Sequence, residues 1–477
     1  MNNKWIISRH TRDMNLLIRV AELIKKYQNT INDEDKDFIL KELELNQVYS
    51  PRFGDSKKST LTSKINQLAF YMFGYKTKLN NDIKFLFSPL SNLLFKYKDD
   101  EKKRDKVFLT MLWGLQFNHP HSQTDIEYEL YPLRLIFNLL KEPLLDNKLY
   151  VSEIAYLIMQ QKNIDKDSYY ILVNEILKFR KYDLKTIEQI FLKDKTNILV
   201  NAVYETDYYL RYILSYFNLI IVNEGNVIAT LSQGKNTTRK LKNTYYSLNN
   251  EYLPFMNKLE NLYSFLDKPL SFKNFQHKLD VVKEIYNFYP NILLEELGED
   301  VDCNILQLPE LINKYSANDD NANAYNFEDV LEQGFNTFKN VDAKKIAGAG
   351  NTDIKCLYLD EEKIFAVEAK STKNKLNLVN DGRLGEHRLK IGAEYTIVIT
   401  PRYVPAVLKD IKNTKNVIIT ASTFSEYLYN SIIKDERNID YKEINDIIIN
   451  NLGTDISDKI SDLTINKFAT LGNDISL

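Results

Sequence analysis

The chain has 477 residues, of which 44% are hydrophobic and 27% are charged, and its formal net charge is −2. This size and balance are typical of a globular protein with more than one domain, and they exclude a uniformly basic nucleic-acid coat protein while allowing local basic patches. Two cysteines are too few for a disulfide framework or a cysteine zinc site, and no apolar run has the length of a membrane span, so we expect a cytoplasmic protein.

Residues 1–165 predict a mainly α-helical domain. A strand-like start is followed within residues 1–50 by two amphipathic helices, and residues 58–76 predict a helix that begins in a cluster of Ser and Thr. Further helices are predicted over residues 107–140, with a break at the sequence FNHPHSQ, and over residues 151–160. The whole chain has few glycines (14) and prolines (11), which favours long helices.

Residues 166–250 predict a winged-helix-like domain, because three helical stretches precede an apolar segment with a turn signal. The sequence IIVNEGNVIATLSQ alternates around Glu224, Gly225 and Asn226, which predicts a β-hairpin. In helix-turn-helix relatives the helix before the wing often enters the major groove of DNA, although such modules also mediate protein contacts. The basic run GKNTTRKLKN that follows the predicted hairpin suits contacts with phosphates.

Residues 251–322 predict a helical linker, and residues 323–477 predict an α/β domain. The linker ends near the polar sequence SANDDNANAYN, which is typical of a connecting segment. After it come an amphipathic helix (FEDVLEQGFNTF), a β-hairpin, two apolar strands (EYTIVITP and NVIITAS) and a further helix (TFSEYLYNSIIKD). The fold class is therefore multidomain, with a mainly α-helical first half and a C-terminal α/β domain that contains a mixed sheet.

The hairpin of the α/β domain is predicted to bring three charged side chains together. Its two apolar stretches, IKCLYL and IFAVEA, are separated by Asp-Glu-Glu-Lys, and a two-residue loop at Glu361 and Glu362 would place Asp353 opposite Lys370. Glu368 lies two residues before Lys370, so both side chains share one face of their strand. We therefore expect the three side chains to converge at the open end of the hairpin.

Two carboxylates beside a lysine suit the metal-dependent hydrolysis of a phosphodiester. Mg²⁺ prefers carboxylate and water ligands, so Asp353 and Glu368 are the predicted metal ligands, with the backbone carbonyl of Ala369 as a further one. Such an ion polarises a phosphoryl oxygen and generates hydroxide, while Lys370 would orient or deprotonate the water or neutralise the phosphate. The alternative interpretation is a solvated hairpin with ordinary surface charges.

These motifs resemble the PD-(D/E)xK nuclease superfamily and, within it, type IIS restriction endonucleases of the AlwI kind and their nicking relatives. The resemblance is carried in chain order by KWIIS, FLTMLW, FNLIIVNEGNVIAT, FEDVLEQGF and AGNTDIKCLYLDEEKIFAVEAKST. Thr352 stands where the family usually has a proline before the first aspartate, whereas Lys370, which some nicking relatives lack, is kept.

The resemblance implies a Mg²⁺-dependent endonuclease that hydrolyses DNA a short distance from an asymmetric recognition site. It implies metal binding by Asp353 and Glu368, catalytic support from Lys370, and an additional catalytic acid at Glu328 on the first helix of the α/β domain. Glu328 is explained equally well as an acid near a helix N-terminus, where the helix dipole favours it. Residues 1–165 would then be the DNA-recognition domain, and the α/β domain would be the nuclease domain.

Double-stranded DNA is the expected partner, and a cognate DNA methyltransferase is expected in the same system. One hairpin supplies one active site, so cutting both strands requires a transient homodimer through the nuclease domain, a partner nuclease subunit or sequential nicking. The following residues are candidate DNA contacts, or else solvated surface charges: Arg9, Arg12, Arg52, Lys57 and Lys58. The alternative functions are a structure-specific repair or junction nuclease and a non-catalytic winged-helix DNA-binding protein.

Overall fold

The structure is a computed structural model in which the chain forms two compact units, Met1–Val281 and Val282–Leu477. The residues that it describes are 4–9, 11–27, 29–49, 57–79, 82–122, 124, 127–194, 196–233, 237–272, 278–298, 303–317, 321–346, 350–434 and 439–468. The predicted boundaries at residues 165–166 and 250–251 fall within the first unit, and the predicted boundary at residues 322–323 falls within the second. Among the described residues, no helix is long and apolar enough to cross a membrane.

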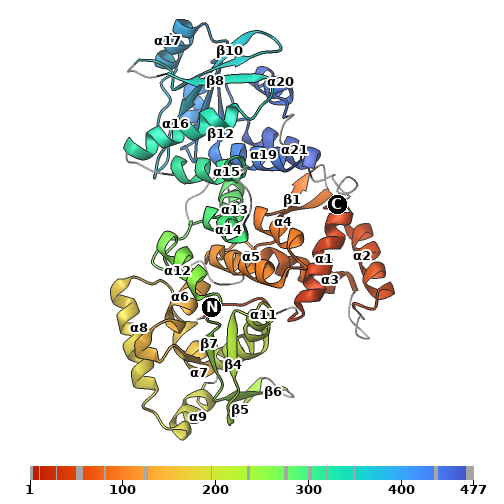
Figure 1. The fold of residues 1–477 in the computed structure, drawn as a ribbon, viewed down its shortest axis with the longest axis vertical. Helices are drawn as coiled ribbons and strands as arrows, with labels where there is room; N and C mark the ends of the chain where they lie inside the picture. Colours follow the sequence, from red (N-terminus) through yellow and green to blue (C-terminus); the bar gives the residue numbers. More distant parts are fainter. Residues whose placement is uncertain are drawn as a thin grey trace. The chain divides into compact units, whose positions relative to one another are not determined.

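The first unit begins with three packed helices and a β-hairpin. Helices α1 (Met14–Lys26), α2 (Asp33–Leu45) and α3 (Lys57–Phe70) contact one another, as the amphipathic pattern predicted (Figure 1). The hairpin of β1 (Gly74–Leu79) and β2 (Asp82–Phe87) was not predicted. The prediction that α3 continues to residue 76 is therefore wrong, because Gly74 already pairs with Phe87 in this hairpin.

The predicted strand at the N-terminus is also wrong, because residues 4–9 form no strand among the described residues. This segment is nevertheless held in place, since the Trp5 backbone N–H donates to Met159 O at 2.7 Å. The remaining predicted helices of the first unit are present, and short helices and strands lie between them. In chain order these elements are α4 (Pro89–Lys96), α5 (Glu101–Gly114), α6 (Pro132–Leu140), η1 (Pro143–Leu145), β3 (Leu149–Tyr150), α7 (Val151–Glu153) and the π-helix η2 (Ile154–Ile158).

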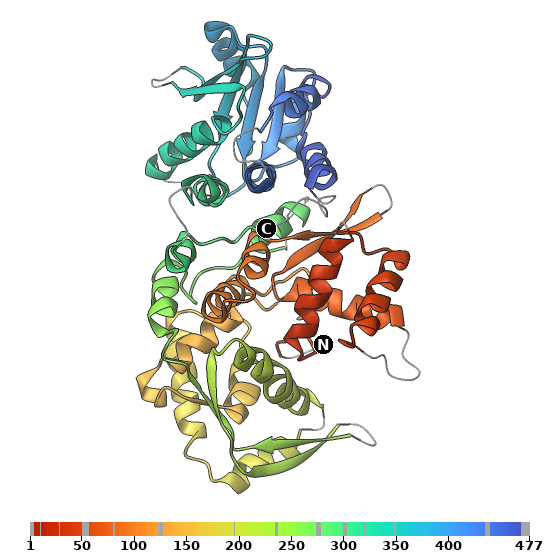
Figure 2. The ribbon, with the colours of Figure 1, turned by 45° about the vertical axis from the view of Figure 1, so that its right-hand side comes forward.

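Residues 166–250 follow the predicted order of helices and then strands. The helical elements are α8 (Lys166–Phe179), α9 (Leu184–Leu192), α10 (Ile198–Tyr204), the π-helix η3 (Glu205–Leu210) and α11 (Arg211–Tyr216). The strands are β4 (Ile220–Asn223), β5 (Val227–Gln233), β6 (Thr237–Lys242) and β7 (Tyr245–Leu248), and α12 (Leu253–Leu262) comes after them. In Figure 2 the strands form the long yellow-green ribbon of this unit.

The predicted hairpin around Glu224, Gly225 and Asn226 is wrong. Strand β4 pairs with β7, and β5 pairs with β6, so β4 and β5 are not partners. Instead β4 and β5 follow each other along one side of a longer two-stranded ribbon, and β6 and β7 form its other side. The backbone between β4 and β5 passes close to Asn243, which lies between β6 and β7. A Cβ atom at Gly225 would lie 2.0 Å from Asn243 O, so only glycine fits there, and the turn signal marks an interruption in the ladder.

The second unit is built around a five-stranded sheet with the order β12-β11-β10-β9-β8. Strands β8 (Val341–Lys345), β9 (Ile354–Tyr358) and β10 (Lys363–Ala369) are antiparallel. Strands β11 (Thr396–Thr400) and β12 (Asn416–Thr420) run parallel to β10, and the two of them are the predicted apolar strands. The mixed sheet is thus confirmed, and β10 lies at its centre.

Helices cover both faces of this sheet, which explains why β11 and β12 are apolar on both sides. The larger core contains Phe335, Phe365 and Tyr441, and the smaller core on the opposite face contains Val398 and Ile418. Helix α13 (Lys278–Tyr286) begins in the first unit and ends in the second. The other helices of the second unit are α14 (Asn291–Leu297), α15 (Cys303–Ser316), α16 (Asn321–Phe335), α17 (Asp381–Ile391), α18 (Ala406–Ile411), α19 (Ala421–Lys434), α20 (Lys442–Ile449) and α21 (Ser457–Phe468) (Figure 1).

The β9–β10 hairpin is confirmed, but its register differs from the prediction by two residues. Lys363 pairs with Tyr358 rather than with Asp360, so the turn has four residues, and Glu362 adopts a positive φ of 53°. Asn340 Nδ2 donates to Asp360 Oδ2 at 2.7 Å, which holds this side chain outside the ladder. Because side chains alternate with a period of two, a shift of two residues leaves every side chain on its predicted face.

Candidate active site

Asp353, Glu368 and Lys370 lie together at one edge of the central sheet, as predicted. Ile354 pairs with Val367, so Asp353 lies opposite Glu368 rather than opposite Lys370. The Ala369 backbone N–H donates to Asp353 Oδ2 at 2.7 Å, and this bond fixes the carboxylate across the end of the hairpin.

Glu368 lies close enough to Asp353 to influence the ionisation of the Asp353 carboxyl group. The pKa of Asp353 is raised to about 7, chiefly because its carboxyl group is buried and also because Glu368 carries a like charge nearby. Lys370 and the Ala369 N–H act in the opposite direction, and Glu328 adds a further repulsion. A pair of carboxylates in this situation favours either a bound proton or a bound cation.

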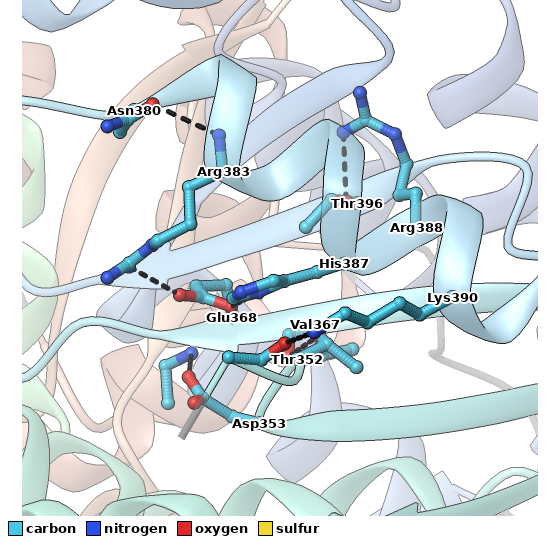
Figure 3. A network of polar contacts seen from close by, with 12 residues as sticks. Thr352, Asp353, Val367, Glu368, Asn380, Arg383, His387, Arg388, Lys390 and Thr396 are labelled. Carbon is cyan, nitrogen blue, oxygen red and sulfur yellow. Dashed lines mark hydrogen bonds and ion pairs between the residues drawn. The ribbon is translucent and has the colours of Figure 1, made fainter. Parts of the chain in front are cut away.

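Cationic side chains surround one oxygen of Glu368. This side chain is only 2% exposed, and its Oε1 atom accepts from Lys370 Nζ at 2.6 Å. The same atom accepts from Arg383 at 3.0 Å (Figure 3). Its Oε2 atom is buried and has no hydrogen-bond partner among the described residues, and the same is true of His387 Nδ1, which lies 3.9 Å from it. One carboxylate oxygen is therefore available for a ligand.

Arg383 and His387 were not among the predicted site residues. Both lie on α17, whose N-cap Asn380 accepts from the Arg383 backbone N–H at 3.1 Å. Their spacing of four residues places them on one face of this helix, which is directed toward the end of β10. The sequence signal existed in that spacing, but only the packing of α17 against the sheet brings these side chains to Glu368.

Thr352 stands where the family that the motifs resemble usually has a proline, and its side chain has a structural role. Its side chain is buried, and its hydroxyl donates to Val367 O at 3.0 Å across the hairpin. This bond joins the residue before Asp353 to the residue before Glu368. Thr352 therefore helps to set the separation of the two carboxylates.

Glu328 lies on α16 and forms an ion pair rather than joining the carboxylate pair directly. Its Oε2 atom lies 3.4 Å from Lys345 Nζ, which also contacts Asp329 at 2.6 Å. Glu328 is near enough to Asp353 to raise the pKa of that carboxyl group. It is therefore placed beside the site.

The residues at this sheet edge fit a hard divalent cation. They offer two carboxylates, one unpartnered buried oxygen and the carbonyl of Ala369, and Mg²⁺ commonly takes one or two protein carboxylates with water and phosphate completing its shell. Within the described part of the chain, no group of three or more His, Cys, Asp or Glu side chains is placed so that it could hold a metal ion by itself. The donor set thus suits an ion that also needs ligands from substrate and water.

The predicted DNA contacts lie in the first unit. Arg9 donates to Asn201 Oδ1 at 3.2 Å, Arg12 lies against tyrosine rings, and Lys58 forms an ion pair with Asp37 at 3.1 Å. Arg52 and the side chain of Lys57 lie outside the described residues.

Comparisons with known proteins identify a family and a relative of this chain. Residues 1–263 match the family described as type II restriction endonuclease HgaI, N-terminal domain. Over 478 residues the chain is 43% identical to the type II restriction enzyme HgaI of Avibacterium volantium, with 97% of each protein covered.

Two solved structures are similar at a lower level. One is the BpuJ1 endonuclease binding domain in complex with pyrene- and phenanthrene-modified DNA, with 17% identity, a TM-score of 0.35 and coverage of 60% of this chain and 94% of that one. The other is restriction endonuclease FokI, with 10% identity, a TM-score of 0.28 and coverage of 94% and 99%. At TM-scores this low, neither likeness bears on the fold or function of this chain.

Proposed function

This chain belongs to the family of the type II restriction endonuclease HgaI and is a site-specific restriction endonuclease; from that premise we propose that it cuts as a type IIS enzyme. In this proposal it binds a short asymmetric sequence in double-stranded DNA and hydrolyses phosphodiester bonds a short distance to one side. The observation that carries the proposal is the pair formed by half-buried Asp353 and buried Glu368, with Lys370 beside it, at the edge of the second unit's sheet.

We assign the second unit's sheet to the PD-(D/E)xK nuclease fold. The support is its mixed order, with an antiparallel hairpin leading into parallel strands, and the position of the two acids and the lysine at the end of β10. The kinship with the AlwI kind, inferred from the motifs, stays a prediction.

Mg²⁺ is the proposed cofactor, held by Asp353, Glu368 and the carbonyl of Ala369. When bound, it would supply polarisation of the phosphoryl oxygen and a lowered pKa for the attacking water. The chain itself supplies the positioning, because the Ala369 N–H fixes Asp353 and the Thr352 bond holds the two strands together.

Lys370 and Arg383 supply positive charge where the phosphate would arrive. Both already bind Glu368 Oε1, and the Arg383 side chain is 52% exposed, so it can turn from this carboxylate to a phosphate without leaving a buried position. Lys370 would orient the attacking water, accept its proton or neutralise the charge that develops on the phosphate. Glu328 is proposed as an additional acid that acts on the site through its charge.

The first unit is the proposed DNA-recognition half. Its winged-helix-like part, residues 166–250, keeps the order of helices before a ribbon, although the ribbon tip lies between β5 and β6. The proposed contacts with DNA are Arg9, Arg12, Arg52, Lys57 and Lys58. One active site per chain calls for a transient homodimer, a partner nuclease subunit or sequential nicking, and a cognate methyltransferase would protect the host DNA.

Mapping the ends of digested DNA tests the type IIS proposal. Purified protein with Mg²⁺ is used to digest plasmid and genomic DNA, and the ends are sequenced. We expect all ends to lie at a fixed offset from one asymmetric sequence. Ends that cluster at junctions, flaps or other irregular structures without a shared sequence would instead indicate a structure-specific nuclease, and binding without any cleavage would indicate a non-catalytic DNA-binding protein.

A further inference from the structure

Three tyrosines form a row on the helical segment that runs through α10, η3 and α11. Tyr204 and Tyr208 stack with ring centroids 5.0 Å apart, and Tyr212 follows with its centroid 6.1 Å from that of Tyr208. Tyr208 is 39% exposed and Tyr212 is 40% exposed. We call these three side chains the tyrosine row.

A π-helical turn, η3, lies between the first and the last ring of the tyrosine row. In an α-helix, residues four apart overshoot a full turn, so a third ring in the series drifts around the helix. The wider turns of η3, between Tyr204 and Tyr212, counter this drift. π-helical turns occur frequently at functional sites.

Two arginines from distant parts of the chain lie on the tyrosine row. The Arg12 guanidinium is held between Tyr208 and Tyr212, at 4.3 and 4.2 Å from their ring centroids. The Arg239 guanidinium, which comes from β6, lies 3.7 Å from the centroid of Tyr204. Aromatic faces of this kind orient a guanidinium and leave its N–H edge available.

Neither arginine has a carboxylate partner within ion-pair distance among the described residues, which sets them apart from their neighbour Arg211. Arg211 binds Asp207 at 3.1 Å and also pairs with Glu224, so its charge is neutralised inside the protein. Rings orient the charges of Arg12 and Arg239, and no carboxylate of the described residues neutralises them. A surface arginine held in this way is prepared for an external anion.

Buried contacts fix the segment that leads to Arg12. Lys4 Nζ lies 2.7 Å from Glu205 Oε2, both side chains are buried, and the Ile7 backbone N–H donates to the same oxygen at 3.0 Å. Arg9 adds its bond to Asn201 on the same helical segment. These contacts hold the N-terminal segment against the helical segment and thereby position Arg12 at the tyrosine row.

The row borders a pocket of positive character on the side of the β5–β6 ribbon. This pocket has a volume of about 260 Å³ and is lined by Val203, Tyr204, Asp207, Tyr208, Arg239, Lys240 and Lys242. Its acid, Asp207, is already bound by Arg211, and Lys240 is exposed. The basic run recognised in the sequence thus contributes to the same surface as Arg12.

We propose that the tyrosine row, with Arg12 and Arg239, is a docking surface for the phosphate backbone of duplex DNA. The surface presents N–H and O–H donors and unneutralised positive charge, which match phosphate oxygens because these only accept hydrogen bonds. The edges of DNA bases, in contrast, carry hydrogen-bond donors as well as acceptors, so a surface that reads bases would also need hydrogen-bond acceptors. The inference rests on the proposed DNA cleavage and adds which surface of the first unit holds the backbone.

Salt-dependent binding of DNA tests this surface. The full-length protein is titrated, in EDTA, against a labelled duplex of roughly 30 base pairs with random sequence, because phosphate contacts do not depend on sequence. Arg12→Gln and Arg239→Gln should each weaken binding about fivefold at low salt and reduce the slope of log K against log [salt] by about 0.9. The matched control is Arg19→Gln, since Arg19 is 40% exposed and pairs with Glu22 at 3.0 Å, so its removal should leave the slope unchanged.

A second pair of variants separates stacking from charge. Tyr208→Phe keeps the ring and should retain the wild-type slope, whereas Tyr208→Leu removes the support of Arg12 and should lower the slope. Equal slopes for wild type, Arg19→Gln and the Arg12→Gln/Arg239→Gln double variant would overturn the inference. So would a change in the sequence at which Arg12→Gln cuts, since that would mean base reading. If wild type itself neither binds nor cuts DNA, the proposed function fails instead.

Discussion

Replacing Asp353 by Asn should stabilise the protein when no metal is present. The pKa of Asp353 is raised from its usual 3.8 to about 7 by burial and by Glu368. The folded protein thus keeps this carboxyl protonated up to about pH 7, whereas the unfolded chain releases the proton near pH 4. Wild-type stability consequently falls as the pH rises through this window, and the Asn variant is spared that loss.

The size of the effect follows from the two pKa values. A displacement of the pKa from 3.8 to about 7 corresponds to roughly 4 kcal/mol above pH 7, to roughly 2 kcal/mol near pH 5, and to nothing well below pH 4. For a unit of this size, roughly 4 kcal/mol changes the melting temperature by about 8–16 °C. The Ala369 N–H can still donate to the amide oxygen of Asn, so the variant keeps that bond.

Scanning calorimetry in EDTA at several pH values measures this difference, and it can resolve separate transitions of the two units. Asp342→Asn is the matched control, because Asp342 is an exposed acid on β8 of the same sheet. Adding Mg²⁺ near pH 8 should raise the wild-type melting temperature but not that of Asp353→Asn. An Asn variant whose melting temperature follows that of wild type at every pH would refute the reasoning.

Three further variants test individual contacts. Lys370→Met should lower the rate of single-turnover cleavage by about 10³-fold. Its Mg²⁺ affinity in calorimetric titration should stay at or above the wild-type value, because Glu368 loses a cation that competes with the metal. Weakened Mg²⁺ binding would contradict this expectation. Glu328→Gln should still cut, but with a half-saturating Mg²⁺ concentration about threefold higher, and complete loss of cleavage would show a direct role instead. Thr352→Val loses its bond to Val367 O and should melt about 2–4 °C lower with cleavage within about tenfold of wild type; an unchanged melting temperature would show that this bond does not hold the strands.

Patterns that depend on neighbouring residues predicted the α/β domain well. The apolar strands β11 and β12 were recognisable because both of their faces are covered, and the hairpin was recognisable from its apolar stretches. The register of the hairpin was not recognisable, because the side chain of Asp360 is hydrogen-bonded to Asn340, twenty residues earlier in the chain. The prediction that the two acids converge was still correct, because an error of two residues in the strand register leaves each side chain on the same face of the sheet.

Features that depend on distant contacts were missed. Nothing local showed that α17 would direct Arg383 and His387 toward Glu368. In the first unit, the turn signal at Gly225 arose from the close approach of Asn243, which a local pattern cannot distinguish from a hairpin turn. The same limit applies to Arg12, whose partners lie almost two hundred residues later in the chain.

The central claim is that Asp353 and Glu368 of the second unit form the active site that cleaves DNA. Its most direct test compares the cleavage rate of Glu368→Gln with the affinity of this variant for duplex DNA. The account predicts a loss of cleavage of about 10³-fold or more with affinity for duplex DNA within about threefold of wild type. Glu361→Gln, at the exposed hairpin turn, should cut at the wild-type rate. A Glu368→Gln protein that cuts plasmid DNA as fast as wild type would contradict the assignment of the active site.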